Sequence, residues 1–267
     1  MSASSIPVTG RTRVLAILAD PVVQARAPSL VNAALAAREK DAVLVPMQVP
    51  DGRLARVLDG LRAIGNFGGA VVSMPHKTAL AALVDETTPE ARQVGACNVV
   101  RRDADGRLVG TMFDGEGFVA GLHAAGHTVR GRRVYLAGAG GAAAAIAFAV
   151  AKHGAAALTI HNRTAAKAEA LADRVRRAFP ACAVAAGGPA PRGHDLVVNA
   201  TALGMRPDDH LPLDAAGLEP GALAAEIVIR DEPTPFLAAA AHRGCRTHPG
   251  APMLVAQIDL MLDFLGL

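Results

Sequence analysis

Aromatic residues are scarce in this chain of 267 residues, which has no Trp, one Tyr and seven Phe. The 27 Lys and Arg side chains are nearly balanced by 24 Asp and Glu, and they form no basic run. Nucleic-acid binding needs a basic patch and often aromatic side chains on which bases stack, so this class of function is disfavoured. The balanced charge and the 51% apolar content also exclude an intrinsically disordered chain.

Cysteine is equally scarce. Cys97, Cys182 and Cys245 are odd in number, lie far apart and form no C-x-x-C pair. This spacing argues against a disulfide framework and against a structural zinc site, and it favours a reducing compartment. The nine histidines are scattered, and we expect no metal ion. We therefore predict a cytoplasmic protein without a metal.

Long hydrophobic runs are also missing. Residues 1–13 are small and polar, and the first apolar run, 14–19, is too short for a signal-peptide core. Residues 134–151 carry no charge, and the length of this stretch, 18 residues, is at the lower bound for a membrane span. Most of this stretch is Ala and Gly, so we interpret it as a strand, a glycine turn and a buried helix. We expect no membrane partner.

What the sequence does contain is an alternation of short apolar strands with Ala-rich helices. At roughly 100–200 residues per domain, the chain is long enough for two domains. The predicted strands are 14–18, 43–47, 70–72, 134–136, 158–160 and 196–198, and the predicted helices include 29–38, 53–64, 118–125, 142–153, 165–179 and an apolar final helix, 253–267. Such alternation is typical of βαβ units, so we predict an α/β fold with parallel sheets.

The strongest single motif is V-Y-L-A-G-A-G-G-A-A at 134–143. Gly138, Gly140 and Ala143 fit the dinucleotide-binding pattern G-x-G-x-x-A, in which the glycines allow a sharp turn and a close approach of the backbone to a pyrophosphate. The amides and the dipole at the start of the following helix favour phosphate. A structural turn in an Ala-rich chain is the alternative, but the strand–turn–helix context favours a dinucleotide.

The end of the next predicted strand bears on the choice of cofactor. About 20 residues beyond the glycines, NAD-binding proteins usually place an acid for the ribose hydroxyls, whereas an Arg there accommodates a 2′-phosphate. Asn162, Arg163 and Lys167 stand in this place, and the nearest acid is Glu169. NADP is therefore favoured, with NAD as the alternative, although a solvated Arg at a helix start is also common.

A third feature pairs Lys77, which follows an apolar strand and Pro75, with Asp114 in a distant Asp-Gly step. A Lys in such a place can donate a proton if an acid orients it. Spacing alone favours a solvated Lys and an ordinary turn.

Taken in order, several segments resemble the shikimate dehydrogenase family, and the resemblance is collinear over residues 14–267. The segments are P-x-K at 75–77, G-A-C-N at 95–98, the aspartate segment 110–117, the glycine turn, N-R-T at 162–164, N-A-T at 199–201, T-P-F-L at 234–237 and M-L-V-A-Q at 253–257. The order of the whole set is far more specific than any one motif.

The resemblance implies a role for individual residues. Lys77 and Asp114 match the family's catalytic pair, Asn98 and Gln257 match residues that contact substrate hydroxyls, and Ser73 replaces a Thr while keeping its hydroxyl. The expected cofactor-binding residues are Gly138, Ala139, Gly140, Gly141, Ala142, Asn162, Arg163, Thr164, Lys167, Asn199, Ala200, Thr201, Gly250 and Met253.

The chain also departs from the family's pattern. Ala25 and Ala27 stand where the family has two serines that hold the substrate carboxylate, and Ile229 stands where it has a Tyr. Met112-Phe113 replaces an Asn-Thr, and 249–252 replaces D-G-x-G. Losing one hydrogen bond to a charged group costs about 1.5–3 kcal/mol, so these changes suggest a substrate that differs at its carboxylate end.

We therefore expect an NADP-dependent oxidoreductase of aromatic amino acid biosynthesis or a close paralogue, which interconverts a shikimate-like secondary alcohol and its 3-dehydroshikimate-like ketone. Alternatives are a shikimate or quinate dehydrogenase that holds the carboxylate through Arg26 or Ser29, a dehydrogenase for another cyclic alcohol, and a non-catalytic NADP or metabolite sensor. The expected partner is a small cyclic hydroxy acid or alcohol, and the expected assembly is a monomer or homodimer.

The order of these segments also predicts the domains. Substrate ligands lie on both sides of the cofactor segments in the sequence. We expect a discontinuous substrate-binding and catalytic domain, 1–112 with 245–267, and a Rossmann-type dinucleotide-binding domain, 113–244, with the active site in the cleft between them.

Overall fold

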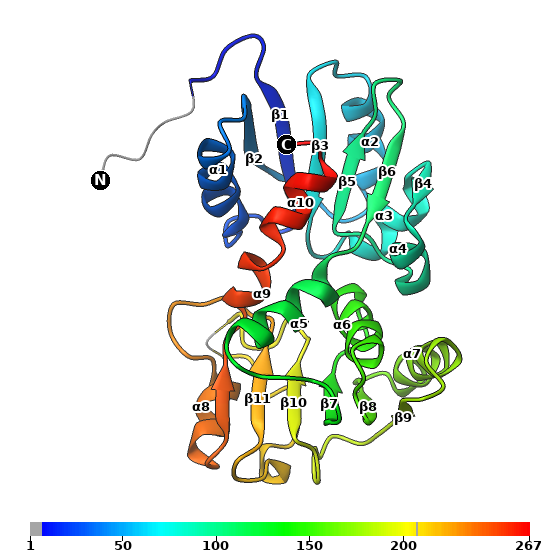
Figure 1. The fold of residues 1–267 in the computed structure, drawn as a ribbon, viewed down its shortest axis with the longest axis vertical. Coiled ribbons are helices and arrows are strands. Elements are labelled where there is room, and N and C mark those ends of the chain that lie inside the picture. The colour runs from blue at the N-terminus through cyan, green and yellow to red at the C-terminus, as the bar shows by residue number, and fades with distance from the viewer. Residues whose placement is uncertain (1–6, 207) are drawn as a thin grey trace. The chain divides into compact units, whose positions relative to one another are not determined.

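The computed structural model describes residues 7–206 and 208–267, so the first six residues of the polar N-terminal segment lie outside it. The chain forms two compact units. Unit 1 contains the residues up to Phe113 together with Gln257–Leu267, and unit 2 is Asp114–Ala256 (Figure 1). Each contains one six-stranded sheet with helices packed against it, and the predicted α/β class is confirmed.

The sheet of unit 1 has the strand order β2-β1-β3-β5-β6-β4. Its strands are β1 (Arg13–Ala19), β2 (Ala42–Gln48), β3 (Phe67–Val72), β4 (Glu86–Thr87), β5 (Val99–Arg102) and β6 (Leu108–Thr111), and its helices are α1 (Ala27–Ala37), α2 (Leu54–Arg62), α3 (Lys77–Leu83), α4 (Pro89–Val94) and α10 (Ile258–Phe264). β1, β2 and β3 are parallel, as predicted, but β5 is antiparallel to both β3 and β6. The sheet is therefore mixed rather than parallel throughout.

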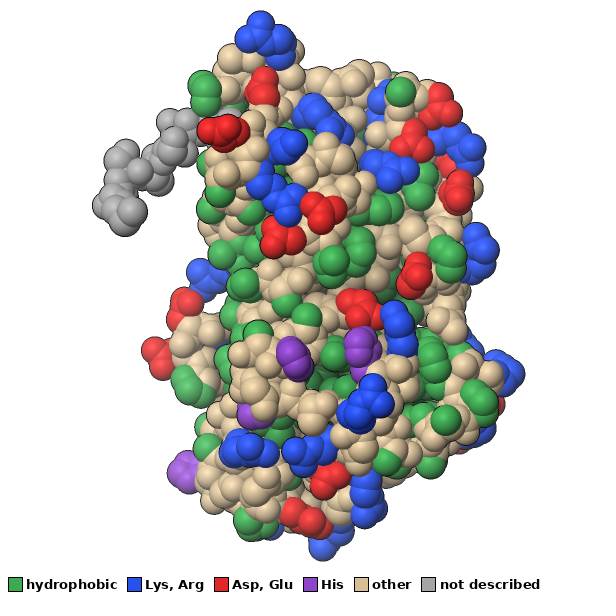
Figure 2. All heavy atoms as spheres, in the orientation of Figure 1, with side chains coloured by type: hydrophobic (Ala, Val, Ile, Leu, Met, Phe, Trp, Pro, Cys, Tyr) green, Lys and Arg blue, Asp and Glu red, His purple; other side chains and the backbone are tan. Residues whose placement is uncertain are grey.

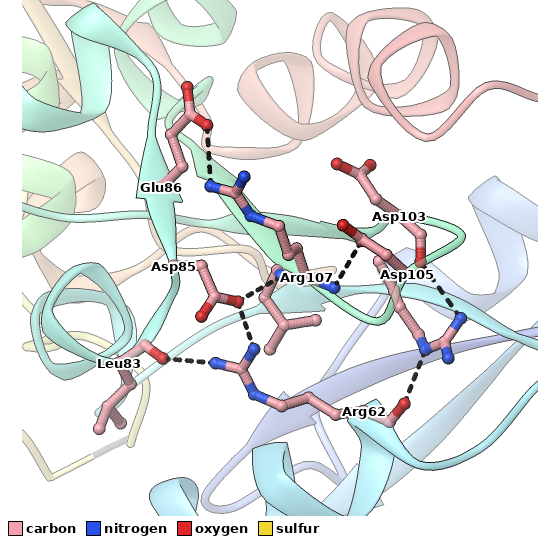
Figure 3. A network of polar contacts seen from close by, with 9 residues as sticks. Arg62, Leu83, Asp85, Glu86, Asp103, Asp105 and Arg107 are labelled. Atoms are coloured by element: carbon pink, nitrogen blue, oxygen red, sulfur yellow. Dashed lines mark hydrogen bonds and ion pairs between the residues drawn. The ribbon is translucent and has the colours of Figure 1, made fainter.

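The β5–β6 hairpin, which the sequence analysis did not predict as strands, is anchored by a network of polar contacts (Figure 3). Asp85 pairs with Arg62 and accepts the main-chain N–H of Leu108 at 2.7 Å. Arg102 Nε donates to the carbonyl of Arg62 at 2.9 Å. The Leu108 N–H and then Arg62 lower the pKa of Asp85, which keeps this anchor charged at neutral pH.

The C-terminal helix α10 completes unit 1. Arg38, which follows α1, donates to Asp259 at 2.6 Å and to Asp263 at 2.7 Å, both on α10. Arg13 on β1 donates to the carbonyl of Leu265 at 3.2 Å. The last segment of the chain is thereby held against the first strand and the first helix.

The single final helix predicted over 253–267 is wrong. The segment forms α9 (Ala251–Val255) in unit 2 and α10 in unit 1, and the helix breaks at Ala256 and Gln257. Gln257 is buried, and its side chain bonds Asn98 of unit 1. The buried polar contact therefore lies where the two helices separate.

The sheet of unit 2 is parallel throughout, with the order β12-β11-β10-β7-β8-β9. Its strands are β7 (Arg133–Ala137), β8 (Ala157–His161), β9 (Ala183–Ala186), β10 (Leu196–Asn199), β11 (Leu223–Glu226) and β12 (Arg246–His248), and the helices of the unit are α5 (Asp114–Ala124), α6 (Gly141–Lys152), α7 (Ala165–Ala178), the 3-10 helix η1 (Ala215–Gly217), α8 (Pro235–His242) and α9. The chain runs outward from β7 to β8 and β9, then returns to β10 on the other side. This is the Rossmann order, with the direction reversing between β7 and β10.

Small residues let the helices of unit 2 approach closely. In α6 every residue from Ala143 to Ala151 is buried, and a Cβ at Gly115 of α5 would collide with the carbonyl of Ala145. The uncharged stretch 134–151 is β7, a turn and α6, as predicted. Among residues 7–206 and 208–267, no helix has the length and apolar character to cross a membrane.

The observed division of the chain differs from the predicted domain boundary at 244/245. Residues 245–256 lie in unit 2, because β12 pairs with β11 and α9 packs on α5. The functions of the two domains stay predictions. Figure 2 shows Lys and Arg side chains interspersed with Asp and Glu over the visible face.

Candidate active site

Strand register brings the predicted cofactor segments to one edge of unit 2. Ala137, His161 and Asn199 are the last residues of β7, β8 and β10, and Ala137 lies opposite both of the others. The residues that follow them, Gly138, Asn162 and Ala200, therefore emerge side by side at the carboxyl edge of the sheet. In open α/β sheets this edge, at the point where the strand order reverses, is where ligands bind.

The turn after β7 requires glycine at its first position. Gly138 has a φ of 122°, and a Cβ there would lie 2.8 Å from the carbonyl oxygen of Ala200. Its N–H donates to the carbonyl of His161 at 2.7 Å. A Cβ at Gly140 would meet nothing within 4 Å. The turn is thus tight against the strands beneath it and open at Gly140.

The start of α6 fits an anionic group. The first turn has no acidic residue and no side chain that caps the helix. The first N–H groups of a helix lack intrahelical partners and carry the positive end of its dipole. Ala143 is buried, and its Cβ would lie 3.3 Å from a Cβ at Gly138, which is the close packing that the motif's third small residue allows.

The segment after β8 presents two cations at the start of α7. Arg163 and Lys167 are exposed, and the first turn of α7 has no acidic residue. Asn162 Nδ2 donates to the carbonyl of Thr164 at 3.0 Å, and this bond shapes the bend into the helix. A pair of cations without an acid fits a ribose that carries a 2′-phosphate. The donor set of unit 2 therefore fits NADP.

Asn199, at the end of β10, orders the third segment. It is fully buried, and its Oδ1 accepts from the N–H of Thr201 at 3.1 Å and from its hydroxyl at 2.7 Å. Its Nδ2 donates to the carbonyl of Leu203 at 2.9 Å. The turn at 199–203 is therefore built around one amide side chain, with Ala200 beneath the glycine turn.

Gly250 and Met253 lie elsewhere in unit 2. Gly250 precedes α9, and a Cβ there would collide with the backbone of Ile227 and Val228, just after β11. Met253 is buried within α9. Their roles toward a cofactor stay predictions.

In unit 1, Ser73 and Lys77 lie at the carboxyl edge of the β1–β3 pair. The N–H of Ser73 donates to the carbonyl of Leu18, near the end of β1, at 2.9 Å. Lys77 is half-buried and begins α3, and its carbonyl accepts the N–H of Cys97 at 2.9 Å. That bond brings Lys77 beside the segment that contains Asn98.

Asn98 and Gln257 are both buried and hydrogen-bonded to each other. Asn98 Nδ2 donates to Gln257 Oε1 at 2.8 Å, and Asn98 Oδ1 accepts the N–H of Phe113 at 2.9 Å. These bonds fix the orientation of both amides, because Gln257 Oε1 faces Asn98 and its Nε2 points the other way. The structure thus brings together Ser73, Lys77, Asn98 and Gln257 within unit 1.

Asp114 follows Phe113 directly and begins α5, where it is 3% exposed. It is the first residue of unit 2, whereas Lys77 belongs to unit 1. The pairing of the two stays a prediction.

Three other side chains of unit 1 that carry a thiol, an imidazole or a hydroxyl are buried or hydrogen-bonded. Burial raises the pKa of the Cys97 thiol to about 12, so the thiol stays protonated at neutral pH. His76 is buried at the start of α3, with its Nε2 2.8 Å from the carbonyl of Val49. Ser29 donates to the carbonyl of Arg26 at 3.0 Å. The role of Lys77 toward a substrate stays a prediction.

The histidines form no metal centre in the described chain. His123 and His127 are spaced as i, i+4, but α5 ends at Ala124, between the two. His127 instead contacts His248, with ring centroids 6.0 Å apart. In the part of the chain that the structure describes, no three His, Cys, Asp or Glu side chains are placed to hold a metal ion.

Glu226 lies at the carboxyl edge of the sheet of unit 2, and the sequence did not point to it. It ends β11 opposite Asn199, and it is 2% exposed. Its oxygen accepts the Thr234 hydroxyl at 2.8 Å, and burial raises its pKa to about 7. The only sequence signal was an acid directly after an apolar run, ahead of the T-P-F-L segment.

Known protein families match segments in both units. The family described as the shikimate dehydrogenase substrate binding domain matches residues 17–100, and the one described as shikimate / quinate 5-dehydrogenase matches 122–203. The chain is 40% identical over 263 residues to a protein of Geobacter metallireducens named shikimate dehydrogenase (NADP(+)), and the match covers 96% of this chain and 91% of the relative.

Solved structures show the same similarity. Shikimate 5-dehydrogenase of Thermus thermophilus, in complex with NADP(H) and shikimate, is 31% identical with a TM-score of 0.85, over 96% of this chain and 94% of that one. The ligand-free 5-ketofructose reductase of a Gluconobacter strain is 32% identical with a TM-score of 0.80, over the same shares. These two structural neighbours are named for different substrates, shikimate and 5-ketofructose.

Proposed function

Because this chain belongs to the shikimate dehydrogenase family, we propose that it is an NADP-dependent oxidoreductase that interconverts a shikimate-like ring alcohol and its 3-dehydroshikimate-like ketone. The reaction is a reversible hydride transfer on a secondary alcohol. Relatives that match nearly the full chain carry the name shikimate dehydrogenase (NADP(+)), and the exposed Arg163 and Lys167 at the start of α7 support NADP over NAD. These comparisons do not favour a non-catalytic sensor or a dehydrogenase for an unrelated cyclic alcohol.

The observation that carries the proposal is the polar set at the edge of unit 1. Lys77, Asn98 and Gln257 are linked by main-chain and side-chain hydrogen bonds. The set combines one cation able to transfer a proton with two oriented amides able to bind hydroxyl groups. A polyhydroxylated ring with one reacting oxygen satisfies this combination.

In the mechanism, bound NADPH supplies the hydride that the carbonyl carbon accepts. The Lys77 ammonium then donates a proton to the oxygen of the developing alkoxide, and the neutral amine takes that proton back in the oxidative direction. Asp114 accepts hydrogen bonds that orient Lys77 and the alcohol. Proton transfer by a positioned side chain contributes about 10²–10⁴-fold to the rate.

The two amides set the orientation of the ring. Since Gln257 Oε1 accepts from Asn98, the Nε2 group of Gln257 is the part of the side chain that donates outward. Its acceptors are hydroxyl oxygens of the substrate, as are those of the Asn98 amide. Ser73 contributes a hydroxyl just beyond the end of β3.

The loop after β1 concerns the other end of the substrate. Ala25 and Ala27 carry no hydroxyl, and Arg26 is the one cation of residues 21–28. A shikimate carboxylate held in this loop is therefore bound through Arg26 and main-chain N–H groups. We further propose that the protein acts in the cytoplasm, which its three free, buried cysteines support.

Steady-state oxidation of shikimate with NADP, followed as NADPH absorbance, tests this proposal. Quinate and a neutral cyclic polyol are assayed in parallel, with NAD replacing NADP in a second series. The proposal expects turnover with shikimate and the larger kcat/KM with NADP. Turnover of the neutral polyol alone would contradict the acid substrate, and tight NADPH binding without any turnover would indicate a sensor.

A further inference from the structure

We propose that Glu226 is a positioning residue for the cofactor site, whose buried carboxylate ties the turn after β10 to the loop after β11 and so makes binding of the dinucleotide depend on pH. The inference rests on the proposed NADP-dependent function. All of the groups involved belong to unit 2.

Glu226 lies between two segments. Its Oε2 accepts the hydroxyl of Thr234 at 2.8 Å. It also lies opposite Asn199 in the β10–β11 pair, and the Asn199 amide favours its ionised form. Thr234 immediately precedes α8, where its Oγ1 accepts the N–H of Leu237 at 3.2 Å. One carboxylate thus lies at the paired ends of β10 and β11 and is bonded to the residue that precedes α8.

These bonds lead to the predicted cofactor residues. Asn199 holds Thr201 through its Oδ1. Ala200, which lies between these two residues, places its carbonyl against Gly138 of the glycine turn. On the other side, the backbone of Ile227, directly after Glu226, packs against Gly250. Glu226 is itself buried, so it acts on the cofactor through the residues it holds.

The charges around Glu226 are few. Burial is the largest influence on its pKa, and the hydrogen bonds from Thr234 and Asn199 and the charge of Arg230 oppose it. Arg230 also donates to the carbonyl of Gly204 at 3.1 Å. On β12, the strand beyond β11, His248 lies opposite Ala225, and burial and the neighbouring His127 lower the pKa of its imidazole.

A buried carboxylate is a costly way to hold two loops together. Burying an ionised group destabilises a fold unless partners compensate, and an amide or an apolar contact would serve stability better. What a carboxylate adds is a strong, switchable acceptor. When ionised it accepts strongly from Thr234 and is favoured by the Asn199 amide, and when protonated it accepts less strongly. Protonation therefore loosens both loops.

The test measures the dissociation constants of NADPH and NADH between pH 5.5 and 8.5, from the fluorescence of the bound reduced nicotinamide. The absence of Trp removes the usual interfering emission. NADH is essential, because the 2′-phosphate of NADPH has its own second pKa near 6. Glu226 acts on both cofactors alike, whereas the phosphate affects NADPH alone.

For the wild type we expect affinity for both cofactors to fall about ten-fold as the pH drops through about 7, as the loss of one charge-assisted hydrogen bond predicts. Glu226→Gln abolishes the step shared by the two cofactors and binds weakly throughout, because its neutral amide is a weaker acceptor than the ionised carboxylate. Thr234→Val shifts the step to higher pH, since the carboxylate loses a bond that favours its ionised form. Thr234→Ser restores the position of the step.

Asp195→Asn is the matched control. Asp195 precedes β10 at the opposite edge of the same sheet, where its carboxylate accepts the N–H of Arg133 at 2.8 Å. This variant removes the negative charge from an acceptor whose hydrogen bond has a similar length and lies away from the glycine turn, while the amide oxygen can still accept the Arg133 N–H. It should keep the wild-type affinities and the wild-type step.

Four results would overturn the inference. If Glu226→Gln keeps the wild-type affinity and pH profile, the carboxylate has no role in cofactor binding. An equal loss in Asp195→Asn assigns the effect to general destabilisation. A wild type that binds neither cofactor overturns the proposed function and this inference with it, whereas a wild type that binds both without a shared step overturns the inference alone. If Glu226→Gln does not fold, the shift in Thr234→Val decides the question.

Discussion

Asn98 and Gln257 are separated by 159 positions in the sequence, yet Asn98 Nδ2 donates to Gln257 Oε1 at 2.8 Å in a buried contact. Asn98 precedes β5 and Gln257 precedes α10. The same Asn98 side chain accepts the N–H of Phe113, the last residue before unit 2 begins. One amide therefore orders three segments of unit 1 and orients a proposed substrate ligand.

Replacing Asn98 with Ala should both destabilise the protein and weaken substrate binding. The variant leaves the Phe113 N–H and Gln257 Oε1 without this partner, which costs about 1–3 kcal/mol for a buried polar group. We expect a lower midpoint of urea unfolding and a KM for shikimate raised about ten-fold, with the affinity for NADPH unchanged. Asn32→Ala is the control, since the Asn32 amide bonds Leu44 elsewhere in unit 1. If it raises KM equally, the orienting role is wrong.

Lys77→Ala should separate catalysis from cofactor binding. Removing the proton donor is expected to lower kcat by about 10²–10⁴-fold. The Kd for NADPH should stay at the wild-type value, because the proposed cofactor-binding residues lie in unit 2. Rapid kinetics of both Lys77→Ala and the exposed-lysine control Lys40→Ala measure the change. An unaltered kcat in Lys77→Ala would rule out the assignment.

Arg163→Ala should reduce the preference for NADPH over NADH. The exposed guanidinium at the start of α7 is the proposed partner of the 2′-phosphate, and losing a hydrogen bond to a charged group weakens binding by about ten- to hundred-fold. We expect KM for NADP to rise by this factor while KM for NAD changes little. Arg177→Ala, in the last turn of the same helix, should leave both values unchanged. An equal rise in both constants for Arg163→Ala would argue against a phosphate contact.

Gly138 and Gly140 should respond differently to substitution by Ala. At Gly138 the φ of 122° and the nearby Ala200 carbonyl make Gly138→Ala strained, with a cost of about 1–3 kcal/mol in the free energy of unfolding. At Gly140 a Cβ meets no protein atom within 4 Å, so Gly140→Ala should fold with wild-type stability but lose NADPH affinity. Denaturation and NADPH titration of both variants test this. Wild-type NADPH affinity in Gly140→Ala would place the pyrophosphate elsewhere.

Glu226 should make the protein less stable as the pH rises from about 4.5 to about 7. Burial raises the pKa of Glu226 to about 7, from an ordinary value of 4.5. Between these values the folded chain keeps the proton and the unfolded chain releases it, so the free energy of unfolding falls with pH. Glu226→Gln removes this contribution, and its stability relative to the wild type should rise by about 1–3 kcal/mol across the window. A difference that does not vary with pH would refute the shifted pKa.

The sequence predicted the parallel core of both sheets well, because β1, β7, β8 and β10 are short apolar runs next to clear turns. It failed at the β5–β6 hairpin, where Arg101 and Arg102 stand in a four-residue strand and resemble a polar turn. Their side chains are held by partners distant in the chain, as in the Arg102 contact with Arg62. Local patterns do not contain that information.

The residues of the candidate site also differ in how far the local sequence predicts them. The glycine turn could be predicted from its own residues, since the G-x-G-x-x-A pattern lies within one short segment. Lys77, Asn98 and Gln257 were identified through the resemblance to the family, which the comparisons confirm, and spacing alone favoured a solvated lysine. Glu226 escaped notice because its burial follows from the pairing of β11 with β10 and from the position of Thr234.

The construction of unit 1 from both sides of unit 2 has a consequence for folding during synthesis. Unit 2 is one uninterrupted stretch, Asp114–Ala256, whereas unit 1 receives α10 only after all of that stretch has been translated. The contacts of Arg38 with Asp259 and Asp263, and of Asn98 with Gln257, cannot form earlier. On the ribosome, the later part of the chain can therefore reach its final structure before the earlier part does, which reverses the usual N-terminal-first order.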